Sequence, residues 1–192
     1  MKKIIGLTFF VIVILLQSRT SLCAPVNVAL GATVTASHSS VGSLPPSNLV
    51  DGNRNTINQI YATTTSGWWE FDLGSQKTVA WLNFVGWGSP GNGYNYTMTH
   101  YKIYYRPTIS DSWIEIIDYT GPIQTDSPYI NEHILPAPVT GQYFRFENYQ
   151  SQYRHPAWNE LELYDSLAIP EPATMILLGT GLIGVALRRR KK

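Results

Sequence analysis

The sequence predicts an all-β domain, a sandwich or a barrel, and three observations support this prediction. Short runs rich in aromatic and β-branched residues recur along the middle of the chain. Clusters of Gly, Pro, Asp, Asn and Ser separate these runs. No stretch of the middle region shows a sustained helical period. Many short strands separated by turns are typical of β-sandwiches and β-barrels.

The domain is expected to fold around the stretch Gly67–Gly86. Two strand-like runs, Trp68–Leu73 and Thr78–Val85, flank the tetrapeptide Gly-Ser-Gln-Lys and predict a β-hairpin. Because side chains alternate along a strand, the face that carries Trp69 is apolar, whereas the face that carries Trp68 is mostly polar. The second run is apolar on both faces, as in an inner strand that is covered on both sides. The tryptophans of Gly67–Gly86 are therefore expected in the core.

Further strands are predicted on both sides of this stretch. Val26–Ser37 is rich in Val, Thr and Ala and is expected to be extended, and a long turn-rich segment, 39–58, follows it. Gly86–Thr99 carries four glycines and three aromatic rings and is expected to be an exposed loop. The later strand-like runs are Tyr101–Arg106, Trp113–Asp118, Ile130–Leu135, Tyr143–Asn148 and Trp158–Tyr164.

Residues 1–24 have the pattern of a secretory signal peptide. Lys2 and Lys3 precede the apolar run Ile4–Leu16, and small residues follow near Cys23, where cleavage is expected. Lipid attachment at Cys23 is the alternative, but Leu22 stands where such a site needs a small residue.

Residues 167–192 contain a second hydrophobic run, which predicts a single hydrophobic helix. Ala173–Leu187 is apolar or small apart from two threonines, and the basic cluster Arg188–Lys192 follows it directly. The run is short against the ~20 residues of a typical bilayer span, although tilt and flanking residues can compensate. The basic end is expected to stay in the cytoplasm.

The segment 25–166 between these ends is acidic and is long enough for one domain. It holds six basic and twelve acidic residues, a formal net charge of −6, whereas the whole chain has +1. An acidic surface argues against nucleic-acid binding and leaves room for a cation. The only cysteine is Cys23, so this segment has no disulfide and depends on packing or on a bound metal.

Six motifs in register carry a family resemblance. They are NVALGATVTAS, PPSNLVDGNRNT, WWEFDLGSQKTVAWLNFVGW, YKIYYRPTISDSWIEI, GQYFRFEN and WNELELY, and together they span Val26–Tyr164. In order and spacing they resemble the coagulation factor 5/8 type C, or discoidin, domain. The resemblance implies an eight-stranded antiparallel jelly-roll β-sandwich of the galactose-binding-like type, with ligand loops at one end. Many bacterial members of this family are carbohydrate-binding modules.

The C-terminal region carries a second resemblance. Pro170, Glu171 and Pro172, followed by the hydrophobic run and the basic end, look like the PEP-CTERM sorting signal of Gram-negative bacteria. The resemblance implies transient retention in the inner membrane, processing near this motif by an exosortase, and a secreted or surface protein linked to exopolysaccharide and biofilm. A permanent single-pass anchor is the alternative.

The segment Asp51–Thr56, DGNRNT, is a candidate metal site. It offers carboxylate, carbonyl, amide and hydroxyl oxygens on a tight turn, which suits Ca²⁺, although such residues often serve only to stabilise a turn. In sugar-binding relatives this loop holds a structural calcium. The resemblance implies as ligands the Leu49 and Asn53 carbonyls, the Asp51 carboxylate, Thr56 and Glu160.

Three loops are candidates for a sugar site: 61–66, 87–96 and 148–158. A pyranose has an apolar face that stacks on an aromatic ring and a rim of hydroxyls that need fixed polar partners. Residues of the last two loops offer both kinds of group, although each of them taken singly is more often an ordinary loop residue. The candidate ligand-binding residues are Trp87, Tyr94, Tyr96, Tyr153, Arg154 and His155.

Catalytic signals are weak. The four histidines show no metal-ligand spacing, and neither Gly-x-Ser-x-Gly nor His-Glu-x-x-His occurs. We therefore expect an exported, non-catalytic protein that binds extracellular polysaccharide or another glycan. The alternatives are a structural or adhesive surface protein that binds another protein through the same loops and, less favoured, an enzyme.

Overall fold

The computed structural model describes residues 24–62, 65–88 and 95–165. These residues form seven strands and one short 3₁₀ helix, η1, and every strand pair is antiparallel. The elements are β1 (Thr33–Ala36), η1 (Pro46–Val50), β2 (Asn58–Gln59), β3 (Gly67–Gly86), β4 (Met98–Arg106), β5 (Ile114–Thr120), β6 (Tyr129–Ser151) and β7 (Ala157–Tyr164). The five runs predicted after residue 100 overlap β4, β5, β6 and β7, and two of them belong to the single strand β6. Of the predicted extended run Val26–Ser37, only Thr33–Ala36 is a strand.

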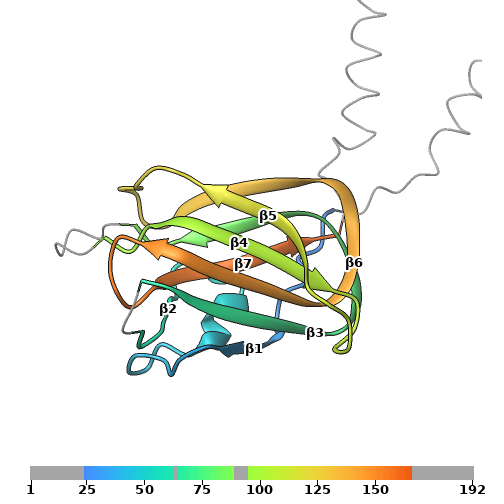
Figure 1. Cartoon of the computed structure of the whole chain (residues 1–192), viewed down its shortest axis with the longest axis horizontal. Helices are drawn as coiled ribbons and strands as arrows, with labels where there is room; N and C mark the ends of the chain where they lie inside the picture. Colours follow the sequence, from blue (N-terminus) through green and yellow to red (C-terminus); the bar gives the residue numbers. More distant parts are fainter. Residues whose placement is uncertain (1–23, 63–64, 89–94, 166–192) are drawn as a thin grey trace, which may run out of the picture. The chain divides into compact units, whose positions relative to one another are not determined.

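Two long strands, β3 and β6, bend and contribute to both layers of a sandwich (Figure 1). Residues 67–72 of β3 pair with residues 143–148 of β6, and β1, β4 and β5 complete this layer. Residues 77–86 of β3 pair with residues 129–141 of β6, and β7 and β2 complete the other layer. Counting both arms of β3 and β6 and leaving aside the two-residue β2, the described strands give the expected eight-stranded antiparallel jelly roll.

The expected hairpin between Trp68–Leu73 and Thr78–Val85 is wrong. The two runs do not pair with each other; both belong to β3, which bends where its register with β6 shifts between Asp72 and Lys77. Gly74 lies at this bend with a φ of 74°, a conformation that glycine adopts without a steric penalty. The bend lets both runs bury apolar faces between two layers, which a hairpin within one sheet would not.

Aromatic rings fill the space between the layers. Phe84, Phe146 and Trp158 are fully buried, with ring centroids 4.6 to 5.1 Å apart, and Trp69 and Phe71 meet Trp158 edge-on. The predicted alternation in β3 is thus confirmed, since Trp69 and Phe71 face the core. The expectation that the tryptophans of Gly67–Gly86 are core residues holds for Trp69 but is wrong for Trp68 and Trp81, which are half-buried.

The expected signal peptide lies outside the described residues except for Ala24, and the expected C-terminal hydrophobic helix lies wholly outside them. Within the described ranges, no helix has the length and apolar character needed to cross a bilayer.

Replacing Trp158 with alanine should destabilise the domain by about 3–5 kcal/mol, because the change leaves a cavity among four aromatic rings. Urea denaturation followed by far-UV circular dichroism measures this. Trp113→Ala is the control, since Trp113 is half-buried beside the Arg106 guanidinium rather than in the core. Equal losses in the two variants would contradict the placement of the core.

Candidate functional site

Oxygen atoms of the Asp51–Thr56 loop converge on the hydroxyl of Thr56. Its Oγ1 atom lies 2.9 and 3.0 Å from the two carboxylate oxygens of Asp51. It also lies 2.7 Å from the carbonyl oxygen of Asn53 and 3.4 Å from that of Asn48. One hydroxyl proton can be donated to only one of these four acceptors. Such an excess of hard oxygen ligands over protons is the arrangement that a cation such as Ca²⁺ requires.

Glu160 in β7 reaches the same loop. Its Oε1 atom accepts a hydrogen bond of 2.8 Å from the backbone N–H of Gly52, a residue of the loop with a φ of 79°. The residue is only 1% exposed, and within the described part of the chain its Oε2 atom has no hydrogen-bond partner. Burial raises the pKa of Glu160 to about 7. A bound cation would compensate the buried carboxylate.

The structure therefore brings together the predicted ligands Asp51, Asn53, Thr56 and Glu160. Leu49 lies in η1, just before the loop, with its side chain buried in the core. Among the described residues, no three His, Cys, Asp or Glu side chains are grouped so that they could share a metal. The donors are instead carbonyl, hydroxyl and carboxylate oxygens, and this set fits Ca²⁺ better than a soft metal.

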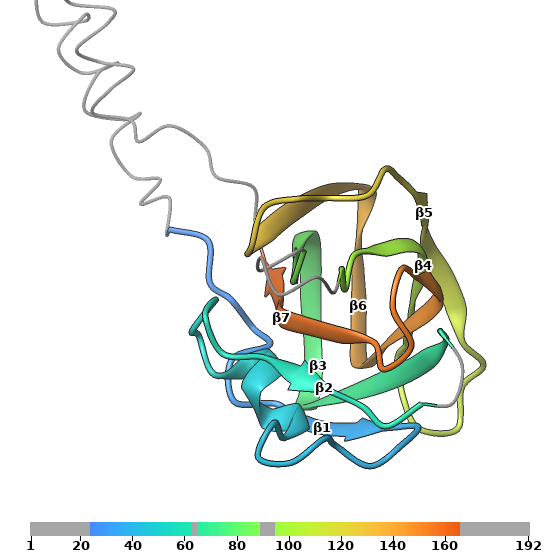
Figure 2. The ribbon, with the colours of Figure 1, turned by 90° about the vertical axis from the view of Figure 1, so that its left-hand side faces the viewer.

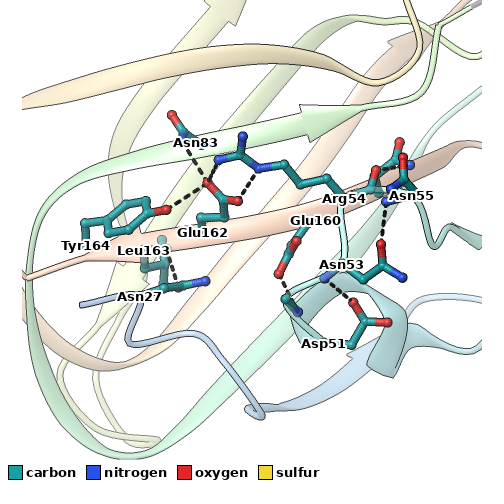
Figure 3. Close-up of polar contacts among 12 residues, drawn as sticks. Asn27, Asp51, Asn53, Arg54, Asn55, Asn83, Glu160, Glu162, Leu163 and Tyr164 are labelled. Carbon is teal, nitrogen blue, oxygen red and sulfur yellow. Dashed lines mark hydrogen bonds and ion pairs between the residues drawn. The ribbon is translucent and has the colours of Figure 1, made fainter. Parts of the chain in front are cut away.

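A clamp of side chains holds this loop against β7 (Figure 3). The guanidinium of Arg54 donates two hydrogen bonds to the carboxylate of Glu162, at 2.6 and 2.7 Å. Although burial opposes ionisation, Arg54 and the side chains of Asn83 and Tyr164 keep the pKa of Glu162 below its ordinary value. Asn159 donates to the carbonyls of Arg54 and Thr56 at 2.9 and 3.0 Å.

Neither Arg54 nor Glu162 is among the site residues predicted from the sequence. Arg54 and Glu162 are separated by 108 positions, so their pairing is not visible as a motif. The one available signal is the alternation along β7, which places Glu162 on the same face as Glu160.

Arg54→Ala should cost about 2 kcal/mol of unfolding free energy, because it leaves the carboxylate of Glu162 buried without its cation. Truncating one partner of a buried charge pair costs about 2–5 kcal/mol. We expect the lower end of this range, since the Arg54 side chain is 41% exposed. The double variant R54A/E162Q should recover part of the loss, because glutamine carries no charge. Urea denaturation of the three proteins measures both effects, and unchanged stability in R54A would contradict the clamp.

Aromatic rings from three loops, β2–β3, β3–β4 and β6–β7, form a row. These loops lie at the end of the sandwich that faces the viewer in Figure 2. Trp87 stacks on Tyr96 with centroids 4.4 Å apart, and the edge of Tyr96 meets Tyr153 at 5.3 Å. Tyr153 meets His155 at 6.0 Å, and His155 meets Tyr61 at 5.0 Å. These five residues are called the end-loop row below.

Members of the row differ in exposure. Tyr96 is buried, so it supports Trp87 from beneath, whereas Tyr61 is 59% exposed. Arg154 is exposed in the β6–β7 loop, which also carries Tyr153 and His155. Tyr94 lies outside the described residues. The structure thus gathers four of the six predicted sugar-site residues in one row. It adds Tyr61, which lies in the candidate loop 61–66 but is not among the six predicted residues.

His155 fixes the turn between β6 and β7. Its φ is 76°, the only positive φ of a non-glycine residue in the described ranges. Such a conformation costs about 1–3 kcal/mol and often occurs at ligand sites. Gln59 donates to the carbonyl of His155 at 3.2 Å and thereby joins this turn to β2.

Comparison with family models identifies both parts of the chain. The F5/8 type C domain model matches residues 33–162. The chain belongs to the F5/8 type C domain family. A second model, the PEP-CTERM protein-sorting motif, matches residues 168–191, so both resemblances are confirmed. The comparison with curated proteins finds no match.

Solved structures share the fold of this F5/8 type C domain at low sequence identity. Chitosan-binding module 1 of a chitosanase/glucanase from Paenibacillus sp. IK-5 is 20% identical, with a TM-score of 0.58, 72% of this chain covered and 98% of the module. The family 32 module of C. perfringens NanJ, solved with galactose, is 17% identical, with a TM-score of 0.61, 73% of this chain covered and 98% of that one. A fucolectin from striped bass is 16% identical, with a TM-score of 0.61. The match covers 74% of this chain and 50% of the fucolectin chain.

Proposed function

We propose that this protein is an exported, non-catalytic carbohydrate-binding protein that binds extracellular polysaccharide through the loops at one end of the sandwich. The observation that carries the proposal is the end-loop row, with Tyr61 exposed at one end of it and Arg154 exposed beside it. Aromatic rings stack on the apolar face of a pyranose, and a guanidinium donates to its hydroxyls. Modules of the same fold that were solved in complex with galactose and with chitotriose support it.

Binding at a single shallow site is expected to be weak, about −4 kcal/mol or a millimolar Kd. Retention in an extracellular matrix would then come from several copies bound to one polymer.

The sorting motif supports an exported or cell-surface location. In the proposed route an exosortase processes the chain near Pro170–Pro172 after transient retention in the inner membrane of a Gram-negative bacterium. The released domain would then associate with exopolysaccharide or biofilm.

The Asp51–Thr56 loop and Glu160 are proposed to hold a structural Ca²⁺. The unmatched acceptors around Thr56 and the unpartnered Glu160 Oε2 support this proposal. When bound, the ion would supply positive charge to these oxygens. The residues of the chain fix the loop, because Asn159 and Arg54 tie it to β7.

Calcium at one hundred times its Kd should stabilise the protein by about 2.7 kcal/mol relative to EDTA-treated protein. Glu160→Gln should abolish this response and should stabilise the metal-free protein above pH 7, since it removes a buried charge. Thermal unfolding with calcium and with EDTA measures both effects. Glu132→Gln, an exposed carboxylate on β6, is the matched control. A full calcium response in E160Q, or none in the native protein, would contradict the site.

On a glycan array, the full-length protein should bind a defined set of glycans. Arg154→Ala should lower the signal at least tenfold, since removing a charged hydrogen bond costs about 1.5–3 kcal/mol. Lys77→Ala, which removes a cationic side chain at the bend of β3 and away from the end loops, should leave the signal unchanged. Absence of any glycan signal, together with retention of the protein by a protein partner in a pull-down, would support the adhesive alternative instead.

A further inference from the structure

A groove of about 330 Å³ lies where β3 begins and β6 ends. It is open to solvent, and its walls include Ser37, His38, Ser66, Trp68, Glu147 and Tyr149. Trp68 and Glu147 are direct partners in the β3–β6 register and face outward from the sheet. The paired backbones of β3 and β6 therefore fix the positions of these two residues in the groove wall.

The indole of Trp68 forms a fixed wall. The guanidinium carbon of Arg145 lies 4.5 Å from its ring and 5.3 Å from the ring of Trp113, so Arg145 contacts both indoles. Arg145 in turn donates to Glu147 at 3.2 Å and lies 4.0 Å from the carboxylate of Glu70. A ring held this way loses little conformational entropy when a ligand stacks on it.

Glu147 offers hydrogen-bond acceptors, and the neighbouring guanidinium of Arg145 balances its charge. Its Oε1 atom accepts from Arg145, and its Oε2 atom accepts from the hydroxyl of Tyr149 at 2.8 Å. A carboxylate has about four acceptor positions, so about two remain for the hydroxyls of a ligand. Because Arg145 balances the charge, the groove suits neutral vicinal hydroxyls better than an ammonium group or a second carboxylate.

The opposite wall supplies a ring nitrogen. The hydroxyl of Ser37 pairs with Nδ1 of His38 at 2.8 Å and accepts a hydrogen bond from the backbone N–H of Trp68 at 3.1 Å. These contacts orient the exposed imidazole and leave its Nε2 atom for a ligand.

The loop residue that precedes the groove wall is tied to β6. The side chains of Asn148 and Ser151 both donate to the backbone carbonyl of Thr65, which joins the loop before β3 to the end of β6. The wall that begins at Ser66 is thus held against the end of β6.

We infer that this groove binds one neutral hexopyranose unit of a glycan, stacked on Trp68 and hydrogen-bonded through two hydroxyls to Glu147. The inference rests on the proposed carbohydrate-binding function. It adds a second binding position outside the end loops and specifies a neutral sugar.

Isothermal titration calorimetry of the full-length protein with galactose, with N-acetylated chitotriose and with unacetylated chitotriose tests the inference. Trp68→Ala and Glu147→Gln should each weaken binding of a neutral sugar at least tenfold. Glu147→Gln keeps the size of the side chain, so it tests the groove even if Trp68→Ala fails to fold. Trp81→Ala is the matched control, because Trp81 stacks on Tyr164 in the other layer and should not affect binding.

The possible failures are distinguishable. Unchanged neutral-sugar affinity in both groove variants, with binding lost in Arg154→Ala, would overturn the groove and leave the proposed function intact. Tighter binding of unacetylated than of N-acetylated chitotriose would overturn the neutral class of ligand. No heat of binding for any of the sugars, together with an empty glycan array, would overturn the proposed function and the groove with it.

Discussion

The structure depends on the pairing of β3 with β6 along almost their whole length. Because both strands bend at the same place, one antiparallel ribbon supplies the centre of both layers. The ribbon carries the aromatic core on its inner faces, and its free ends meet at the end of the sandwich where the end-loop row and the groove lie. Any shift of register in this ribbon would exchange core and surface side chains and would displace both candidate sugar positions.

The Asp51–Thr56 loop, where Ca²⁺ is proposed to bind, is called the cation loop here. It is linked to the end-loop row through β2 and β7. Asn159 holds the carbonyls of the cation loop, and the next residue back, Trp158, is the register partner of Asn58 in β2. Gln59 then contacts the turn at His155, against which Tyr61 packs. A cation bound at Asp51 and Glu160 would therefore stabilise the short β2 strand and, through it, one end of the row. This arrangement explains how a structural ion could support sugar binding without touching the sugar.

Much of the fold could be predicted from local sequence because alternation and turn residues are local signals. The core position of Trp69 and Phe71, the strands after residue 100 and the oxygen-rich turn at Asp51 all follow from such signals. The bend of β3 could not be predicted, since a hairpin and a bent strand have the same local pattern. The clamp between Arg54 and Glu162, and the groove between Ser37 and Glu147, depend on contacts across about one hundred residues. Only the register of the sheet brings these groups together.

The central claim is that one end of the sandwich binds saccharide. The most direct measurement is a titration of the ¹⁵N-labelled full-length protein with N-acetylated chitotriose, followed by amide chemical shifts in NMR spectra. The account predicts shift changes confined to the end-loop row, which includes Tyr61, Trp87 and Tyr96, to the Ser37–His38 segment and Trp68, and to the region from Glu147 to His155. Changes centred on β5 or on the outward face of β7, or no change at saturating sugar, would contradict it.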